Sequence, residues 1–216
     1  MVQDAIGRGI LPPVFDCVMT AAGASSRMGE FKPLLPFRGS TLVEVAVGAA
    51  LGAGCRVILV VGKRGEEVAF PFTAASYSHA SAGRRIAVVR NPRWEEGMLV
   101  SIQTALPEVE GEAFFVSHAD MPFVSPDSYR TLAAARAARE AAGLPEAATV
   151  ASHGGRGGHP VLMPSAWIPG MLDLRAGDSM RTFLQGRPRV AVEMGPGALR
   201  DVDTPEDYRR ALAGEI

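Results

Sequence analysis

Short apolar runs rich in β-branched residues alternate along the chain with longer segments in which apolar and polar residues mix. The short runs predict buried strands at 16–21, 56–61, 85–90, 113–118 and 147–151. The segments between them read as helices, and this alternation is typical of a mostly parallel sheet that helices cover on both faces. Ligands bind such sheets beyond the carboxyl ends of the strands. The residues that follow strands are therefore the first candidates for a functional site.

Three of the predicted helices have recognisable ends. Thr41 and Glu44 have the spacing of a capping box, and a Gly-Ala-Gly cluster ends the helix that they open. Ser125 opens a second helix, with a proline and an aspartate in its first turn, and Gly143 closes it. Thr204 opens the last helix in the same manner.

The composition favours one globular domain. The chain has 216 residues, 47% hydrophobic and 21% charged, so we predict a single domain over residues 1–216 with residues 1–14 as an N-terminal tail. The charges of the 22 basic and 23 acidic side chains nearly cancel. We therefore expect no general electrostatic attraction to nucleic acid or to an anionic membrane. Neither a membrane span nor a signal peptide is recognisable, and we expect a cytoplasmic protein. Two buried thiols are the expected state of Cys17 and Cys55.

The segment after the first predicted strand, residues 21–32, is rich in small residues and reads AAGASSRMGEFK. Small residues let the backbone approach a ligand closely, and successive amide N–H groups can then bind phosphate oxygens. Arg27 and Lys32 add two cations, although a tight turn with two solvated bases remains the alternative. The loop has neither GxGxxG nor a Walker A pattern. The predicted nucleotide-binding residues of this loop are Ala21, Ala22, Gly23, Ala24, Ser25, Ser26, Arg27 and Lys32.

Two acids are candidates for binding a divalent cation. Asp120 follows the strand at 113–118 and precedes a proline, where a carboxylate can bind Mg²⁺ beside a triphosphate or, alternatively, cap the turn. Asp201 and Asp203 are two residues apart, so at a strand end both would point to one face. The alternative for Asp203 is the N-terminus of the last helix, which attracts acids.

Other positions are candidates for contact with a nucleobase or a second substrate. Gly97 would let the backbone reach a base edge, and Ser101 would contact the base or the ribose, although an ordinary helix start explains both. His159 follows a glycine-rich stretch, 154–157, that we expect to be flexible, and a lone histidine is more often structural than a ligand. For His118, just ahead of Asp120, we assign no chemical role.

The segment at residues 21–32, called the glycine loop below, resembles together with the residues that follow it the signature of the MobA-like NTP transferases. The signature reads AAGxSxRMGxxKxLLP, and the matching residues are AAGASSRMGEFKPLLPF. Later segments fit the same family in the same order between residues 16 and 212: NPRWEEGMLVSIQTAL, ADMPFV, GHPVLM, GDSMR and DVDTPEDYRRAL. The family includes the molybdenum cofactor cytidylyltransferases and guanylyltransferases. The resemblance implies an α/β fold of the nucleotide-diphosphosugar-transferase type, a Rossmann-like three-layer sandwich with a mostly parallel mixed sheet.

The resemblance also implies roles for individual residues. Asp120 matches the metal-binding aspartate of the family, and Asp203 matches an aspartate near the catalytic metal. Arg27, Lys32 and Asp120 are the implied catalytic residues, and the segment with Gly97 and Ser101 belongs to the nucleotide pocket.

The acceptor side matches the family less closely. His159 matches the histidine of its GHP motif, and Asp178 and Arg181 match the acid and the arginine of GDxGAR, so these three are the implied acceptor-binding residues. Ser179 and Met180 replace the small Gly-Ala pair of that motif, which puts the acceptor contacts in doubt.

The function implied is the Mg²⁺-dependent transfer of an NMP from an NTP onto a phosphorylated small molecule, with release of pyrophosphate. CTP is favoured as the nucleotide, because ADMP and GHP resemble the cytidylyl branch more than the guanylyl branch. Molybdopterin is the implied acceptor and a molybdoenzyme the implied protein partner. Two alternatives remain open: a sugar- or polyol-phosphate nucleotidyltransferase, and a non-catalytic accessory protein that binds a nucleotide or a pterin for molybdoenzyme maturation.

Overall fold

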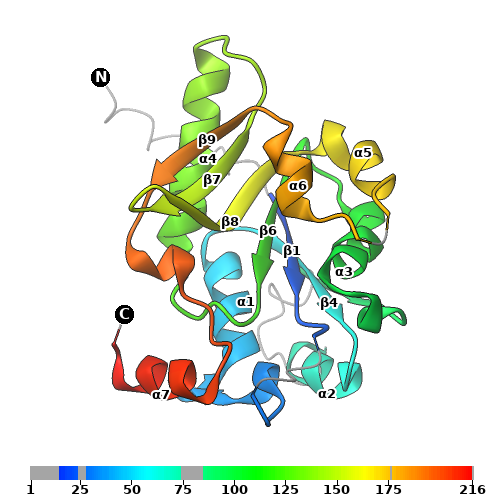
Figure 1. Cartoon of the computed structure of the whole chain (residues 1–216), viewed down its shortest axis with the longest axis vertical. Helices are drawn as coiled ribbons and strands as arrows, with labels where there is room; N and C mark the ends of the chain where they lie inside the picture. Colours follow the sequence, from blue (N-terminus) through cyan, green and yellow to red (C-terminus); the bar gives the residue numbers. More distant parts are fainter. Residues whose placement is uncertain (1–14, 24–27, 74–84, 176, 216) are drawn as a thin grey trace.

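A seven-stranded mixed sheet forms the centre of the computed structural model, which describes residues 15–23, 28–73, 85–175 and 177–215 (Figure 1). The strand order is β5-β4-β1-β6-β8-β7-β9. Its strands are β1 (Asp16–Thr20), β4 (Arg56–Val61), β5 (Ile86–Arg90), β6 (Ala113–His118), β7 (Ala148–His153), β8 (Arg156–Pro164) and β9 (Arg189–Glu193). A separate two-stranded ribbon joins β2 (Pro36–Phe37) to β3 (Ser40–Thr41).

The sheet is mostly parallel. Strand β1 pairs in parallel with β4 and β6, β4 with β5, and β7 with β9, whereas β8 runs antiparallel to both β6 and β7. The seven helices of the described residues are α1 (Leu42–Gly52), α2 (Gly65–Ala69), α3 (Met98–Ala105), α4 (Pro126–Ala141), α5 (Ile168–Leu172), α6 (Met180–Gln185) and α7 (Pro205–Ala213). None of the helices in the described ranges has the length and apolar character needed to cross a bilayer.

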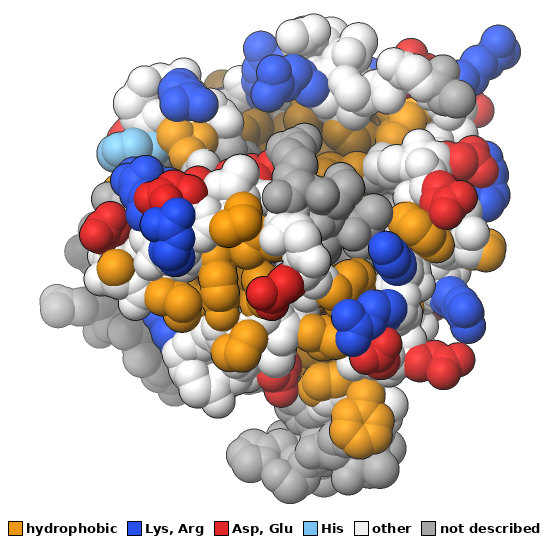
Figure 2. All heavy atoms as spheres, turned by 60° about the horizontal axis from the view of Figure 1, so that its bottom comes forward, with side chains coloured by type: hydrophobic (Ala, Val, Ile, Leu, Met, Phe, Trp, Pro, Cys, Tyr) orange, Lys and Arg blue, Asp and Glu red, His pale blue; other side chains and the backbone are white. Residues whose placement is uncertain are grey.

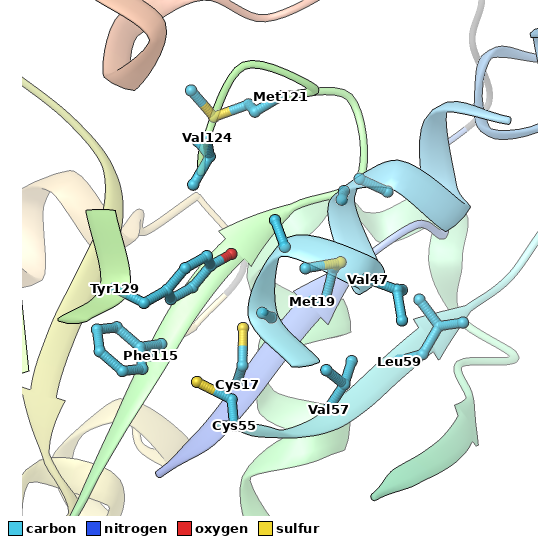
Figure 3. Packing of buried hydrophobic residues seen from close by; sticks show 14 of the residues in the cluster. Cys17, Met19, Val47, Cys55, Val57, Leu59, Phe115, Met121, Val124 and Tyr129 are labelled. Carbon is cyan, nitrogen blue, oxygen red and sulfur yellow. The ribbon is translucent and has the colours of Figure 1, made fainter. Parts of the chain in front are cut away.

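Helices cover both faces of the sheet, as predicted, and two cores lie between the layers. Successive residues of a strand point to opposite faces, so Cys17 and Met19 join one core while Val18 joins the other. Helices α1 and α4 complete the first core, in which Tyr129 packs edge-on against Phe115 with ring centroids 5.1 Å apart (Figure 3). Helices α3, α5 and α6 contribute to the second core. The predicted three-layer α/β fold is therefore confirmed.

The predicted strand positions agree with the structure to within one or two residues, but two strands of the large sheet, β8 and β9, were not predicted, nor were the two short strands of the ribbon. The prediction of a buried strand at 85–90 is wrong in its burial, because β5 is an edge strand with Val88 and Arg90 exposed. Residues 154–157, which we expected to be flexible, connect and begin two paired strands. Gly154 and Gly155 form the tight turn of the β7–β8 hairpin, with φ angles of 55° and 77° that favour glycine.

The predicted helix starts are confirmed by their hydrogen bonds. Thr41 and Glu44 form a reciprocal capping box at α1. Ser125 caps α4 and Thr204 caps α7, each through the backbone N–H three residues later. The two cysteines are buried free thiols, as expected.

Candidate active site

Three of the predicted site residues converge at one point near the carboxyl ends of β1 and β6. Lys32 opens the short 3-10 turn η2 (Lys32–Leu34), Asp120 lies in the turn after β6, and Asp203 lies just ahead of α7. The Lys32 Nζ atom is 2.7 Å from Oδ2 of Asp120 and 2.7 Å from Oδ1 of Asp203. The fold thus brings together a lysine and two acids that are 88 and 171 residues away from it in sequence.

The backbone holds the two acids beside each other. The N–H of Val202 donates to the carbonyl oxygen of Asp120 at 2.8 Å, and the Val202 side chain is buried in a small core with Phe37. Thr204 caps helix α7, so the Asp203 carboxylate is not the capping group and pairs with Lys32. The helix-cap alternative for Asp203 is therefore not what the structure shows.

The charges of this cluster affect one another. Burial alone would lower the pKa of Lys32. The negative charge of Asp120 and the hydrogen bonds that Lys32 donates to Asp120 and Asp203 outweigh the effect of burial, so the pKa of Lys32 is raised above its usual value. Burial raises the pKa of Asp201, and the negative charges of Asp203 and Asp120 raise it further. Within the described residues, the carboxylates of Asp120 and Asp203 therefore share the Lys32 ammonium group, and Asp201 lies close enough for its pKa to respond to all three charges.

The donor set fits a magnesium ion. Two carboxylate oxygens point at one position, which the ammonium of Lys32 occupies as the cation. Within the part of the chain that the structure describes, no three His, Cys, Asp or Glu side chains form a complete metal-ligand group. Mg²⁺ typically takes one or two carboxylates and completes its shell with substrate phosphate oxygens and water. The binding of Mg²⁺ by Asp120 and Asp203 stays a prediction.

The glycine loop is described only in part. Ala21 and Ala22 are buried, and Gly23 is exposed with no atom within 4 Å of the place where a Cβ would stand. The predicted residues Ala24, Ser25, Ser26 and Arg27 lie outside the described residues.

Sequence reasoning missed Gly62, which directly follows β4 beside this loop. A Cβ at Gly62 would stand 2.5 Å from Cβ of Trp94 and 2.9 Å from the carbonyl oxygen of Ala22. Only a glycine lets the end of β4 approach the loop this closely. The signal available in the sequence was a glycine immediately after an uninterrupted apolar strand.

Gly97 and Ser101 lie at the start of α3. Gly97 has a φ of 107°, a conformation that favours glycine, and precedes the helix as its N-cap. The Ser101 hydroxyl is buried, accepts a hydrogen bond from Nδ2 of Asn91 at 2.9 Å and lies 3.4 Å from the carbonyl oxygen of Gly97. Ser101 therefore holds the loop between β5 and α3 in place, and Asn91 is a positioning residue that sequence reasoning missed.

A chain of hydrogen bonds connects β1, β6 and β8 behind Asp120. Oγ1 of Thr20 is 2.7 Å from Nδ1 of His118, and Nε2 of His118 is 3.1 Å from Nε2 of His159. Nδ1 of His159 lies 3.4 Å from the carbonyl oxygen of Val116, which can only accept, so this nitrogen carries the proton. The direction of the chain follows: His118 donates to His159 through Nε2 and accepts from the Thr20 hydroxyl through Nδ1.

These hydrogen bonds show what the two histidines contact within the protein. Both ring nitrogens of His159 lie within hydrogen-bond distance of protein atoms, and its predicted contact with an acceptor stays a prediction. His118, to which sequence reasoning gave no role, links His159 to the strand that leads into Asp120.

The two histidines, His118 buried and His159 partly buried, make the fold sensitive to acid. Burial lowers the pKa of His118 to about 4, with a contribution from the charge of Lys32, and burial together with His118 lowers the pKa of His159 to about 3. The unfolded chain therefore binds more protons than the folded protein below pH 6.5, and the free energy of unfolding should fall as the pH drops from 6.5 towards 4. The expected loss is up to about 1.4 kcal/mol per pH unit for each histidine.

Urea unfolding between pH 7.5 and 5 measures this slope. The His159→Asn variant should show a smaller slope than the wild type, whereas His153→Asn, a change at a half-exposed histidine, should keep it. Equal slopes in the wild type and His159→Asn would contradict the prediction.

Asp178 lies between α5 and α6, and Arg181 lies in α6; neither takes part in this chain of hydrogen bonds. Asp178 is exposed, and its Oδ2 accepts the backbone N–H of Arg175 at 2.7 Å, which closes a local turn. Arg181 is exposed in the first turn of α6. Their predicted contact with an acceptor stays a prediction.

Figure 2 shows the molecule turned so that the bottom of the Figure 1 view comes forward. On this face, positively and negatively charged side chains lie side by side. This mixture agrees with the near-zero net charge of the chain. The described residues on this face therefore present a surface of mixed charge rather than a broad basic patch.

Comparison with known proteins agrees with this geometry. The sequence model described as the MobA-like NTP transferase domain matches residues 17–192. The chain is 33% identical to the molybdenum cofactor cytidylyltransferase of Escherichia coli (strain K12) over 194 residues, which are 89% of this chain and 93% of that protein.

Solved structures agree on the fold. A nucleotidyl transferase from Methanothermobacter thermautotroptrophicus superposes with a TM-score of 0.76 at 23% identity, over 94% of this chain and 98% of that chain. A manganese complex of Rv0371c from Mycobacterium tuberculosis H37Rv superposes with a TM-score of 0.65 at 25% identity, over 93% and 98%. The fold is that of the nucleotide-diphosphosugar transferases and the protein is a nucleotidyltransferase: the chain belongs to the MobA-like NTP transferase family.

Proposed function

We propose that the protein transfers a CMP unit from CTP to the terminal phosphate of a molybdopterin-type acceptor, with Mg²⁺ as its metal. An oxygen of the acceptor phosphate attacks the α-phosphorus of the nucleotide and forms a new P–O bond. The bond from the α-phosphorus to the bridging oxygen breaks, and pyrophosphate leaves with that oxygen and its electron pair. The reaction needs positioning and charge stabilisation more than an acid–base residue.

The observation that carries the proposal is the convergence of Lys32, Asp120 and Asp203. The two acids would hold Mg²⁺, which when bound neutralises charge on the phosphates. Lys32 is a compact cation that would bind the triphosphate and stabilise the charge that develops on the leaving pyrophosphate. Arg27, which lies outside the described residues, is proposed to add a second cation on the phosphates.

The acceptor supplies the nucleophile, so no protein side chain has to attack. The two cysteine thiols are buried within the sheet core, and burial raises the pKa of Cys55 to about 12. Neither thiol is available as a nucleophile at neutral pH.

Two relatives support the choice of substrate and metal. The E. coli relative is a molybdenum cofactor cytidylyltransferase, which supports CTP and a molybdopterin acceptor, and hence a molybdoenzyme as the destination of the product. The manganese complex of the mycobacterial protein supports a divalent cation.

A nucleotide screen followed by a turnover assay tests the proposal. With Mg²⁺ present, the preferred NTP at 100 times its Kd should raise the free energy of unfolding by about 2.7 kcal/mol, and CTP should give the largest thermal shift of the four NTPs. Molybdopterin should then support release of pyrophosphate from CTP. Release with sugar or polyol phosphates in place of molybdopterin would favour that alternative, and binding without any release would favour the accessory-protein alternative.

A further inference from the structure

We propose that Lys32 is a placeholder cation, which occupies the metal position between Asp120 and Asp203 until a nucleotide gives its ammonium group a new partner. Lys32 thereby makes the binding of the metal depend on the binding of the nucleotide. This inference rests on the proposed function, because it concerns the same metal and the same triphosphate.

The geometry leaves one position for two cations. Nζ of Lys32 stands 2.7 Å from one oxygen of each carboxylate, so it already takes the place where both acids would bind an ion. The Lys32 side chain is 14% exposed, whereas those of Asp120 and Asp203 are 28% and 34% exposed. A metal bound by both acids would meet an ammonium group at contact distance, and repulsion between like charges makes joint occupancy unfavourable.

The type of residue at position 32 supports the same conclusion. Of the 22 basic residues in the chain, only Lys32 and Lys63 are lysines and the rest are arginines. An arginine would present a planar fork, whereas the lysine ammonium is a compact point charge, as a metal ion is. The position between the two carboxylates therefore holds the side-chain cation that is most like the metal.

Nucleotide binding would free the position. The flexible four-carbon stem of lysine lets the ammonium move to phosphate oxygens, which offer it several negative charges in exchange for two carboxylates. The carboxylates are then available to the metal. Because coupling between two ligands is reciprocal, the metal alone should bind weakly and each ligand should strengthen the other.

Binding of Mn²⁺ in the absence of nucleotide tests the inference, with free Mn²⁺ measured by electron paramagnetic resonance. Lys32→Met removes the competing charge, so this variant should bind Mn²⁺ at least about tenfold more tightly than the wild type. Lys63→Met removes the exposed lysine after β4 and should bind Mn²⁺ as the wild type does. Equal or weaker binding by Lys32→Met, with its fold intact by circular dichroism, would overturn the inference.

Two further measurements cover the case in which Lys32→Met does not fold. Lys32→Gln is a second neutral variant with the same expected gain in Mn²⁺ affinity. In the wild type, the ammonium nitrogen signals of the two lysines can be followed by NMR. Saturating Mg²⁺ should move the Lys32 signal towards that of an exposed lysine and leave Lys63 unchanged, and an unmoved Lys32 signal would overturn the inference.

Failure of this inference is distinguishable from failure of the proposed function. The Mn²⁺ measurement uses no acceptor and no turnover. If the wild type releases pyrophosphate from CTP while Lys32→Met binds Mn²⁺ no more tightly, the function stands and the inference falls. If no NTP supports turnover but Lys32→Met gains Mn²⁺ affinity, the inference stands and the function falls.

Discussion

Asp120→Ala is expected to lower kcat/KM for pyrophosphate release by about 10²–10³-fold or more, because it removes one of the two carboxylates that would hold the metal against the phosphates. The fold should remain intact. The Asp120 side chain is 28% exposed and pairs with Lys32, which keeps Asp203 as a second partner. Such a partly exposed ion pair contributes at most about 1 kcal/mol to stability.

The measurement is Mg²⁺-dependent pyrophosphate release together with thermal unfolding. Asp127→Ala is the matched control, since Asp127 is an exposed acid in the first turn of α4 and pairs with Arg130. Its turnover should equal that of the wild type. If Asp120→Ala keeps normal turnover, the assignment of Asp120 to the metal is wrong.

Gly158→Ala is expected to lower the free energy of unfolding by about 1–3 kcal/mol and to reduce turnover as well. A Cβ at Gly158 would stand 2.0 Å from the carbonyl oxygen of Ala198 and 2.7 Å from Cδ2 of Leu199. These atoms belong to the 3-10 turn η7 (Pro196–Leu199), so the added methyl group would push this turn and β8 apart. The turn leads within four residues to Asp203, so its displacement should also move the Asp203 carboxylate away from Asp120.

Urea unfolding and pyrophosphate release measure the two effects. Gly186→Ala is the control, because no atom lies within 4 Å of a Cβ at this position and its φ of −84° suits any residue. Gly186→Ala should change neither quantity. An unchanged free energy of unfolding in Gly158→Ala would show that η7 adapts without cost.

Comparison of prediction and structure shows why two strands escaped the sequence analysis. β8 contains two glycines and ends in a proline, and residues of these types are uncommon inside strands. β9 is a short strand at the edge of the sheet, and its residues alternate between exposed and partly buried. Both are stabilised by neighbours that are distant in sequence: β8 by β6, and β9 by β7. The pattern of residues within a strand does not show which other strand it pairs with.

Individual site residues were predictable to different degrees. Lys32, Asp120 and Asp203 are charged, follow recognisable element boundaries and match a family signature, so each could be predicted on its own. Ser101 was predicted to contact the base or the ribose, which stays a prediction, and in the structure its hydroxyl is buried against Asn91. Periodicity alone does not decide which way a serine at a helix start faces. His118 carried no local signal, because its partner His159 is 41 residues away.

The sequence by itself determined the class of fold, the caps of the main helices, the family and the kinds of group available to the site. Those properties depend on local hydrophobic period, on turn chemistry and on motifs that are contiguous in the chain. Tertiary structure alone decided that one ammonium lies between two carboxylates and that two histidines share a hydrogen bond. Such contacts depend on strand order and register, which bring residues from distant segments to between 2.7 and 3.1 Å of each other, and no local pattern encodes a distance.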